Sequence, residues 1–295
     1  MDGVLVICKE KGYTSHDVVA KLRGILHMKK IGHTGTLDPD AEGVLPVVLG
    51  KATKLADMLT EKEKTYEAVL HLGIVTDTQD MTGTVLFEAQ PEEDEEKIRQ
   101  AVESFLGPQM QVPPMYSALK VDGKKLYELA REGKTVERAP RQVQFYSIDI
   151  LEIKPPLVSF RVTCSKGTYI RTLCHDIGQK LGCGGCMEKL VRTKTGRFSM
   201  EEALTLSQVE KMAGEGTIAE KVIGLETVLA EYPAVHSLME ADRLLENGNS
   251  VKEKDTADPL ITEGWVRMYT SRDRFVGIYA WEPKRRRYSP VKMFL

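Results

Sequence analysis

The sequence lacks any apolar run long enough to cross a membrane, and its first residues, MDGVLVICKEKG, lack the form of a secretion signal. These two absences argue against a membrane-spanning or exported protein and favour the cytoplasm. The 295 residues are 42% hydrophobic and 28% charged, as in ordinary soluble globular proteins. A chain of this length has room for one large domain and a small one, each with a core of its own.

Cysteine is also scarce. The five cysteines are odd in number and unevenly spread, which argues against a disulfide framework. Cys183 and Cys186 form a CxxC pair, so a zinc protein or a thiol oxidoreductase is one alternative interpretation. A structural zinc site needs four ligands, and no second CxxC or His pair stands at finger-like spacing. We therefore expect reduced thiols and no metal site.

There is no excess of positive charge, because 41 Lys and Arg stand against 43 Asp and Glu. Binding to nucleic acid needs local clusters of positive charge, not a basic total. Such a cluster exists between residues 114 and 143, where four acids stand against seven basic residues: Lys120, Lys124, Lys125, Arg131, Lys134, Arg138 and Arg141. A second basic run, Lys284 to Arg287, suits phosphate contact or an exposed turn.

The most distinctive stretch is a glycine-rich loop with one carboxylate at its centre, Gly-His-Thr-Gly-Thr-Leu-Asp-Pro at residues 32–39. Gly32 and Gly35 permit backbone angles that other residues avoid, and Pro39 restricts Asp38 to extended geometry. The apolar run Val44 to Leu49 predicts a buried strand immediately afterwards. A shaped loop anchored on a strand is typical of catalytic loops. The alternative is a turn in which Asp38 accepts local backbone amides.

Periodicity predicts a mixed chain of helices and strands. Thr14-Ser15 is an N-cap signal, followed by apolar residues at helical spacing from Val18 to Leu26, and Asp122-Gly123 is a tight-turn signal. We expect strands at residues 4–8, 44–49, 65–73, 84–87, 143–153, 157–164, 265–269, 275–280 and 291–294. Helices are expected at residues 51–59, 92–106 and from about Thr168, with an interrupted helical region over 200–228.

The stretch from Lys29 to Leu55 closely resembles the catalytic motif of TruB-type tRNA pseudouridine-55 synthases. Four further segments resemble that family: Lys9 to Ser15, with Glu10 where the family has proline, Thr76 to Gly83, Cys164 to Leu173, and Leu190 to Phe198. The resemblance covers roughly residues 3 to 200. It implies an α+β pseudouridine synthase fold with a central, mainly antiparallel sheet flanked by helices and loops. It also implies a catalytic domain at 1–230 with a thumb insertion at about 114–143, and a small β-rich PUA-like RNA-binding domain at 231–295.

The resemblance also implies roles for particular residues. Asp38 would be the nucleophile and Arg171 its partner, and Tyr66 would stack on the target base and be a candidate proton acceptor. The implied substrate-binding residues are His33, which props the flipped-out RNA, Leu190, which lines the base pocket, and Tyr169, Lys9 and Lys120. Periodicity alone would make Tyr66 and Leu190 core residues and Arg171 a solvated arginine off the buried stripe of its helix.

The implied reaction is the isomerisation of uridine 55 in the T-loop of tRNA to pseudouridine, by base flipping and without cofactor or metal. The implied partner is tRNA, bound by a monomer without other proteins. Two alternatives remain open: an RNA-guided synthase of the H/ACA type, which lacks the thumb and works with partner proteins, and a catalytically silent RNA chaperone.

Overall fold

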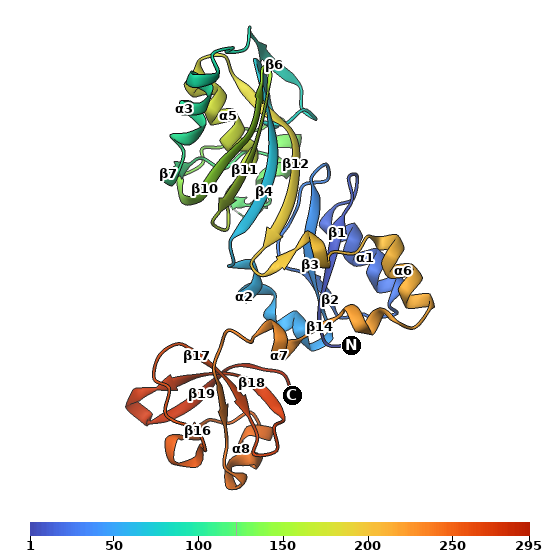
Figure 1. Cartoon of the computed structure of the whole chain (residues 1–295), viewed down its shortest axis with the longest axis vertical. Coiled ribbons are helices and arrows are strands. Elements are labelled where there is room, and N and C mark those ends of the chain that lie inside the picture. The colour runs from blue at the N-terminus through green and yellow to red at the C-terminus, as the bar shows by residue number, and fades with distance from the viewer. Residues whose placement is uncertain (122) are drawn as a thin grey trace.

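The structure is a computed structural model that describes residues 1–121 and 123–295. Its larger part is built on a ten-stranded sheet with the order β14-β1-β3-β12-β4-β11-β10-β7, to which β13 and β2 are added at β12 and β3 (Figure 1). Among the described strands of this sheet, β3 and β12 alone pair in parallel, so the prediction of a mainly antiparallel sheet is confirmed. The strands are β1 Gly3–Lys9, β2 Ile31–His33, β3 Glu42–Leu49, β4 Lys64–Leu72, β7 Gly107–Gln111, β10 Arg141–Lys154, β11 Leu157–Cys164, β12 Gly185–Thr195, β13 Phe198–Ser199 and β14 Ile223–Gly224.

Burial patterns explain why these segments are strands. In β4 buried and half-buried residues alternate along its whole length, so Tyr66, Ala68 and Leu70 share the covered face as predicted. β3 is instead buried from Gly43 to Leu49, because one hydrophobic cluster covers one side of it and a second cluster, which includes Leu55, Leu59 and Val228, covers the other. Gly43 has φ +106, and a Cβ on it would lie 2.2 Å from the Arg192 carbonyl oxygen. Only glycine lets β3 and β12 approach this closely.

The helices begin at clear caps. α1 Ser15–Ile25 starts with a capping box between Thr14 and Asp17, and α3 Glu95–Glu103 starts at Asp94. α5 Ile170–Leu181 begins two residues later than predicted, because Tyr169 keeps an extended backbone as its N-cap. The helix expected at 51–59 is split into η1 Gly50–Leu55 and α2 Ala56–Thr60. The interrupted region contains η2 Met200–Glu202, α6 Leu206–Gly214, η3 Ile218–Lys221 and α7 Leu225–Val228.

Two excursions leave the sheet. The hairpin β5 Ile74–Thr76 and β6 Val85–Glu88 follows β4. The insertion between β7 and β10 carries β8 Lys120–Val121, β9 Lys124–Lys125 and the short helix α4 Leu126–Arg131. Gly123 has φ +83, as the expected turn requires, while Asp122 lies outside the described residues.

A second, five-stranded sheet forms the C-terminal domain, in the order β15-β17-β18-β19-β16. Its elements are β15 Ala234–His236, η4 Met239–Ala241, α8 Asp242–Glu246, β16 Val251–Lys252, η5 Glu253–Asp255, β17 Trp265–Tyr269, β18 Phe275–Glu282, η6 Pro283–Arg285 and β19 Arg287–Met293. β15 and β16 were missed because two or three residues show no alternation. β19 begins four residues before the predicted start, since charged residues and a proline obscure its pattern.

The C-terminal domain lies next to the end of the larger part that carries α2 and α7, and it shares a hydrophobic cluster with that part (Figure 1). Ile278 and Phe294 are buried in one hydrophobic cluster with Val4, Val48 and Leu55. At the edge of this cluster an ion pair joins Lys62 to Glu231, and Lys292 binds Asp57 across 235 positions of sequence. The contact is therefore a continuous core with a polar border.

No helix of the described chain combines the length and the hydropathy needed to cross a bilayer.

The shared core makes a testable prediction. Ile278 is fully buried in the hydrophobic cluster that both domains share, so Ile278→Ala should lower the free energy of unfolding by about 2 to 5 kcal/mol through lost burial and a cavity. Urea denaturation measures the change. Met239→Ala, at a side chain that is 68% exposed in the same domain, is the control and should stay within about 0.5 kcal/mol of wild type. Equal stability of the two variants would contradict a shared core.

Candidate active site

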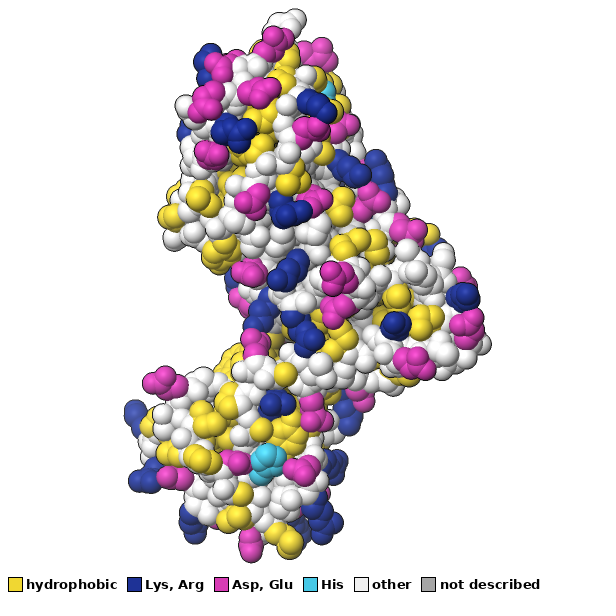
Figure 2. Space-filling view, in the orientation of Figure 1, with side chains coloured by type: hydrophobic (Ala, Val, Ile, Leu, Met, Phe, Trp, Pro, Cys, Tyr) yellow, Lys and Arg dark blue, Asp and Glu magenta, His cyan; other side chains and the backbone are white. Residues whose placement is uncertain are grey.

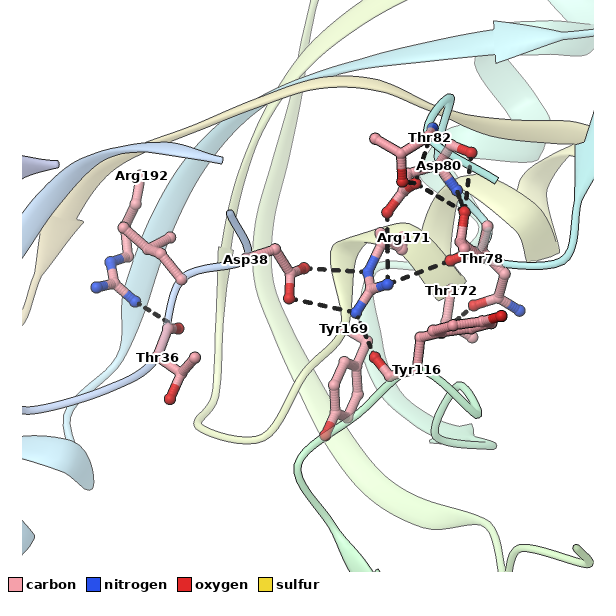
Figure 3. A network of polar contacts seen from close by, with 12 residues as sticks. Thr36, Asp38, Thr78, Asp80, Thr82, Tyr116, Tyr169, Arg171, Thr172 and Arg192 are labelled. Atoms are coloured by element: carbon pink, nitrogen blue, oxygen red, sulfur yellow. Dashed lines mark hydrogen bonds and ion pairs between the residues drawn. The ribbon is translucent and has the colours of Figure 1, made fainter. Parts of the chain in front are cut away.

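Asp38 lies in the loop between β2 and β3 and faces Arg171 in the first turn of α5 (Figure 3). The Nε atom of Arg171 is 3.1 Å from Asp38 Oδ2, and Nη2 donates to Asp38 Oδ1 at 3.4 Å. Two nitrogens of one planar guanidinium thus meet two oxygens of one carboxylate, which fixes the orientation of both groups. The structure brings together two residues that are 133 positions apart.

The loop that carries Asp38 is held at both ends by buried cations. On one side Arg192, which is 1% exposed on β12, donates to the carbonyl oxygens of Val44, Gly35 and Thr36 at 2.7, 3.3 and 3.4 Å. On the other side Lys9, fully buried at the end of β1, donates to the Pro39 carbonyl at 2.9 Å. These charge-assisted bonds make the loop a rigid support for the carboxylate.

Lys9 is not exposed, as a lysine that binds substrate would be. The ammonium group also donates to the carbonyl oxygens of Glu10 and Tyr13, at 3.0 and 2.6 Å, so its three protons all have backbone partners. Burial lowers the pKa of Lys9 to about 8. A buried ammonium with no spare donor does not reach a phosphate, and we do not retain Lys9 among the substrate-binding residues.

Arg171 also differs from the surface arginine that helical periodicity suggested. Its side chain is 6% exposed, because the first turn of α5 faces the Asp38 loop and the β5–β6 hairpin instead of solvent. Besides Asp38, the guanidinium donates to the carbonyl oxygens of Thr78 and Tyr116 at 3.2 and 2.9 Å. Two backbone carbonyls thus add to the carboxylate in holding the guanidinium.

Asp80 is a second carboxylate on the same arginine that residue-by-residue reading did not single out. Its Oδ2 accepts from Arg171 Nη1 at 3.4 Å, and its Oδ1 accepts from the Thr78 hydroxyl and the Thr82 amide at 2.7 and 3.0 Å. Figure 3 shows Arg171 between the two aspartates. The resemblance of residues 76–83 to a family segment was the available signal, but it carried no role for Asp80.

The electrostatics of Asp38 combine opposing effects. Burial raises the pKa of the Asp38 carboxyl, the Arg171 guanidinium opposes that rise, and the nearby Asp80 carboxylate adds to it. The Asp38 side chain nevertheless remains 40% exposed, so a reactant can reach it. A carboxylate that is accessible and paired with a fixed cation suits nucleophilic chemistry.

Tyr66 and Leu190 lie on adjacent strands beside this pair. Tyr66 on β4 is opposite Arg192 on β12, and Leu190 is opposite Ala68. Both side chains are mostly buried, at 9% and 7% exposure. Burial raises the pKa of the Tyr66 phenol and the Arg192 guanidinium opposes the rise, while the charge of Asp38 adds to it. Tyr66 is therefore within electrostatic reach of Arg192 on β12 and of Asp38 in the loop.

The remaining predicted residues lie in different places. Tyr169 caps α5, and burial raises the pKa of its phenol. His33 ends β2, accepts a hydrogen bond from the Gly35 amide on Nδ1, and meets the ring of His16 edge-on at 5.8 Å. Burial lowers the pKa of His33, which favours the neutral imidazole. Lys120 is exposed on β8 in the insertion, apart from the Asp38 network.

The basic run near the C-terminus is partly neutralised. Arg285 and Arg287 pair with Glu282, and Arg286 pairs with Glu253. Lys and Arg side chains nevertheless gather along the outer margin of the C-terminal domain in Figure 2. Lys252 and Lys254 join Arg285 and Arg286 around one open depression.

The cysteines of the described part of the chain form neither a disulfide nor a metal site. All five are free thiols, and no three His, Cys, Asp or Glu side chains among residues 1–121 and 123–295 gather into a metal site. Burial raises the pKa of Cys186 to about 11, which keeps that thiol protonated. The CxxC pair is therefore packed inside the fold.

Comparison with known proteins connects this geometry to a family. Residues 23–170 match the model described as TruB family pseudouridylate synthase (N terminal domain), and residues 171–232 match the tRNA pseudouridylate synthase B C-terminal domain. The chain is 49% identical to a tRNA pseudouridine synthase B from Lachnoclostridium phytofermentans over 100% of both chains. It is 44% identical to the protein of the same name from Clostridium tetani, over 94% of this chain and 95% of the relative.

Two solved structures share the fold. One is described as a Cbf5-Nop10-Gar1 complex, with TM-score 0.75 and 30% identity over 99% of this chain and 85% of that chain. The other is an H/ACA RNP bound to a substrate RNA, with TM-score 0.74 and 27% identity over the same shares. The predicted α+β fold with a small C-terminal β domain is confirmed.

The ion pair makes a prediction that is independent of any reaction. Arg171→Gln removes the positive charge beside Asp38, so the pKa of Asp38 should rise above its wild-type value. A carbon-detected NMR titration of the aspartate carboxyl groups measures it. Arg161→Gln, which removes an exposed guanidinium paired with Glu67 on the neighbouring strands, is the control and should leave Asp38 unchanged. An unchanged or lower pKa in the Arg171 variant would exclude the arrangement described above.

Proposed function

Because the chain belongs to the TruB family of pseudouridylate synthases, we propose that it isomerises uridine 55 in the T-loop of tRNA to pseudouridine, with Asp38 as the nucleophile. The enzyme class and the tRNA substrate follow from the family and its named relatives. The position in tRNA and the residue roles are the proposal. The observation that carries it is the accessible Asp38 carboxylate held against the buried Arg171.

The chemistry needs no electron carrier. The bond between N1 of uracil and the sugar breaks, the base rotates, and C5 becomes attached to the sugar. C5 then loses its proton, and N1 gains one. We propose that ionised Asp38 forms a transient covalent adduct with the uridine, which separates one difficult step into two easier ones. Arg171 keeps the carboxylate charged and oriented, and Asp80 holds the other side of that guanidinium.

Access requires the target base to leave its stack and enter a pocket. Tyr66 on β4 and Leu190 on β12 are diagonal neighbours in the sheet, since Leu190 is opposite Ala68, and they would line that pocket, with Tyr66 stacked on the base. Because burial raises the pKa of Tyr66, its phenol holds its proton in the free enzyme. If Tyr66 acts as a proton acceptor, the neighbouring Arg192 charge would help by favouring the ionised phenol. His33, Tyr169 and Lys120 complete the proposed RNA contacts, with the insertion as the main source of phosphate clamps.

A stand-alone enzyme is favoured over an RNA-guided one. The named tRNA synthases are 49% and 44% identical to this chain, whereas the Cbf5 complex is 30% identical and the H/ACA RNP is 27% identical. A silent chaperone is disfavoured because Asp38, Arg171 and Tyr66 are all in place. We accordingly propose a monomer that acts on free tRNA in the cytoplasm, with the PUA-like C-terminal domain as a second RNA-binding surface.

The proposal predicts that the purified protein forms pseudouridine at position 55 of an unmodified tRNA transcript without guide RNA or added protein. Chemical mapping of pseudouridine measures the product and its position. Asp38→Asn should bind the transcript but lose roughly 10⁴-fold or more of the rate, because an amide is not a nucleophile. Asp40→Asn, at an exposed carboxylate of the same loop, is the control and should keep its activity.

Two outcomes would contradict this assignment. Normal turnover by Asp38→Asn would remove the nucleophile role, and dependence of the wild type on a guide RNA would favour the alternative class.

Two further variants test the partners of Asp38. Tyr66→Phe should lose about 10²-fold or more of kcat if its hydroxyl takes part in proton transfer. Arg171→Lys should also lose more kcat than affinity, because a lysine cannot form the two-point contact with Asp38. Single-turnover rates and filter-binding affinities separate the two effects. A change confined to tRNA affinity would assign either residue to binding instead of catalysis.

A further inference from the structure

Gln111 is a buried polar side chain at the base of the insertion that neither the motifs nor the proposed mechanism uses. It ends β7, the strand from which the insertion departs, and it is 4% exposed. We propose that Gln111 is a positioning residue that fixes the start of α5, and with it Arg171, against the base of the insertion. This inference rests on the proposed function for its readout, while the hydrogen bonds of Gln111 and Tyr116 support the positioning role itself.

The first contact is a two-point bond between a side chain and the backbone. The Gln111 Nε2 atom donates to the Tyr169 carbonyl oxygen at 3.0 Å, and the Tyr169 amide donates to Gln111 Oε1 at 2.8 Å. The carboxamide thus pairs with Tyr169 as a neighbouring strand would, across 58 positions of sequence. Two parallel hydrogen bonds fix both the distance and the tilt of the Tyr169 backbone.

The second contact joins Arg171 to the same segment that carries Gln111. Arg171 follows Tyr169 by two residues, and its Nη2 donates to the carbonyl oxygen of Tyr116 at 2.9 Å. Tyr116 follows Gln111 by five residues in the same segment, and its hydroxyl donates to Asp77 at 3.3 Å. The segment from Gln111 to Tyr116 therefore holds α5 at two places, the backbone before Arg171 and the guanidinium itself. Any displacement of this segment changes the position of Arg171 relative to Asp38.

The rest of α5 does not depend on this carboxamide. Ile170, Leu173 and Ile177 bury the helix in the main core, and Gly182 with φ +78 ends it. The two bonds from Gln111 act only on the first turn, which carries Arg171. Loss of the carboxamide should therefore leave a folded helix with a less constrained guanidinium.

The test uses Gln111→Glu and Gln111→Leu in the full-length protein. A protonated glutamic acid can donate to the Tyr169 carbonyl and accept from its amide, whereas a carboxylate places an oxygen against that carbonyl. Leucine can do neither at any pH. Gln109→Glu and Gln109→Leu are matched controls two residues earlier on β7, where the side-chain amide donates a long hydrogen bond to the Ser104 carbonyl at 3.4 Å. Single-turnover rates on the tRNA transcript are measured from about pH 6 to about pH 9. Each rate is divided by the wild-type rate at the same pH.

We expect both Gln111 variants to bind the transcript as wild type does and to lose about 10- to 100-fold of the single-turnover rate near pH 8, as small misplacements of catalytic groups do. The Gln111→Glu ratio should recover toward one as the pH falls, and the Gln111→Leu ratio should stay low. Dividing by the wild-type rate removes the loss of rate at low pH that protonation of Asp38 would cause in every variant. Both Gln109 controls should match wild type.

The inference is overturned by wild-type rates in both Gln111 variants, by a loss confined to tRNA affinity, or by a Gln111→Glu deficit that does not change with pH. A deficit that follows the fraction of unfolded protein in a parallel thermal melt also overturns it. Failure of the proposed function is a separate result, because the wild type itself would then form no pseudouridine.

Discussion

The ion pair between Asp38 and Arg171 is the interaction on which the rest of the site depends. Burial raises the pKa of the Asp38 carboxyl, and the nearly buried Arg171 guanidinium opposes that rise only while it is held beside the carboxylate. Every acceptor around Arg171 contributes to this requirement. Asp80 and the Thr78 carbonyl come from one hairpin, and the Tyr116 carbonyl comes from the insertion.

The second constraint is the backbone of the Asp38 loop. Its carbonyl groups bind two buried cations, Arg192 and Lys9, which costs the fold two desolvated charges. Fixed cations on carbonyl oxygens hold the loop without covering the Asp38 side chain. The arrangement combines a rigid backbone with an accessible carboxylate, as preorganised sites require.

The sequence predicted what is local or repetitive, and it missed what depends on distant contacts. Alternation found β4 and placed Tyr66 on the covered face, and the Thr14 cap located α1. The pairing of Asp38 with Arg171 came from family resemblance, since no periodicity relates residues 133 positions apart. Burial of Lys9 and Arg171 was missed because charged residues are normally exposed, and only the tertiary partners reverse that preference.

The continuous core that joins the two sheets has a consequence for substrate choice. Ile278 and Phe294 share their cluster with Val4 and Val48 of the central strands, so the C-terminal domain is not suspended on a linker. The shared cluster therefore holds the basic margin of this domain at a fixed distance from Asp38. An RNA that touches both places must offer a phosphate backbone of matching span, so the length and bend of a folded RNA are selected together with the nucleotide that enters the pocket.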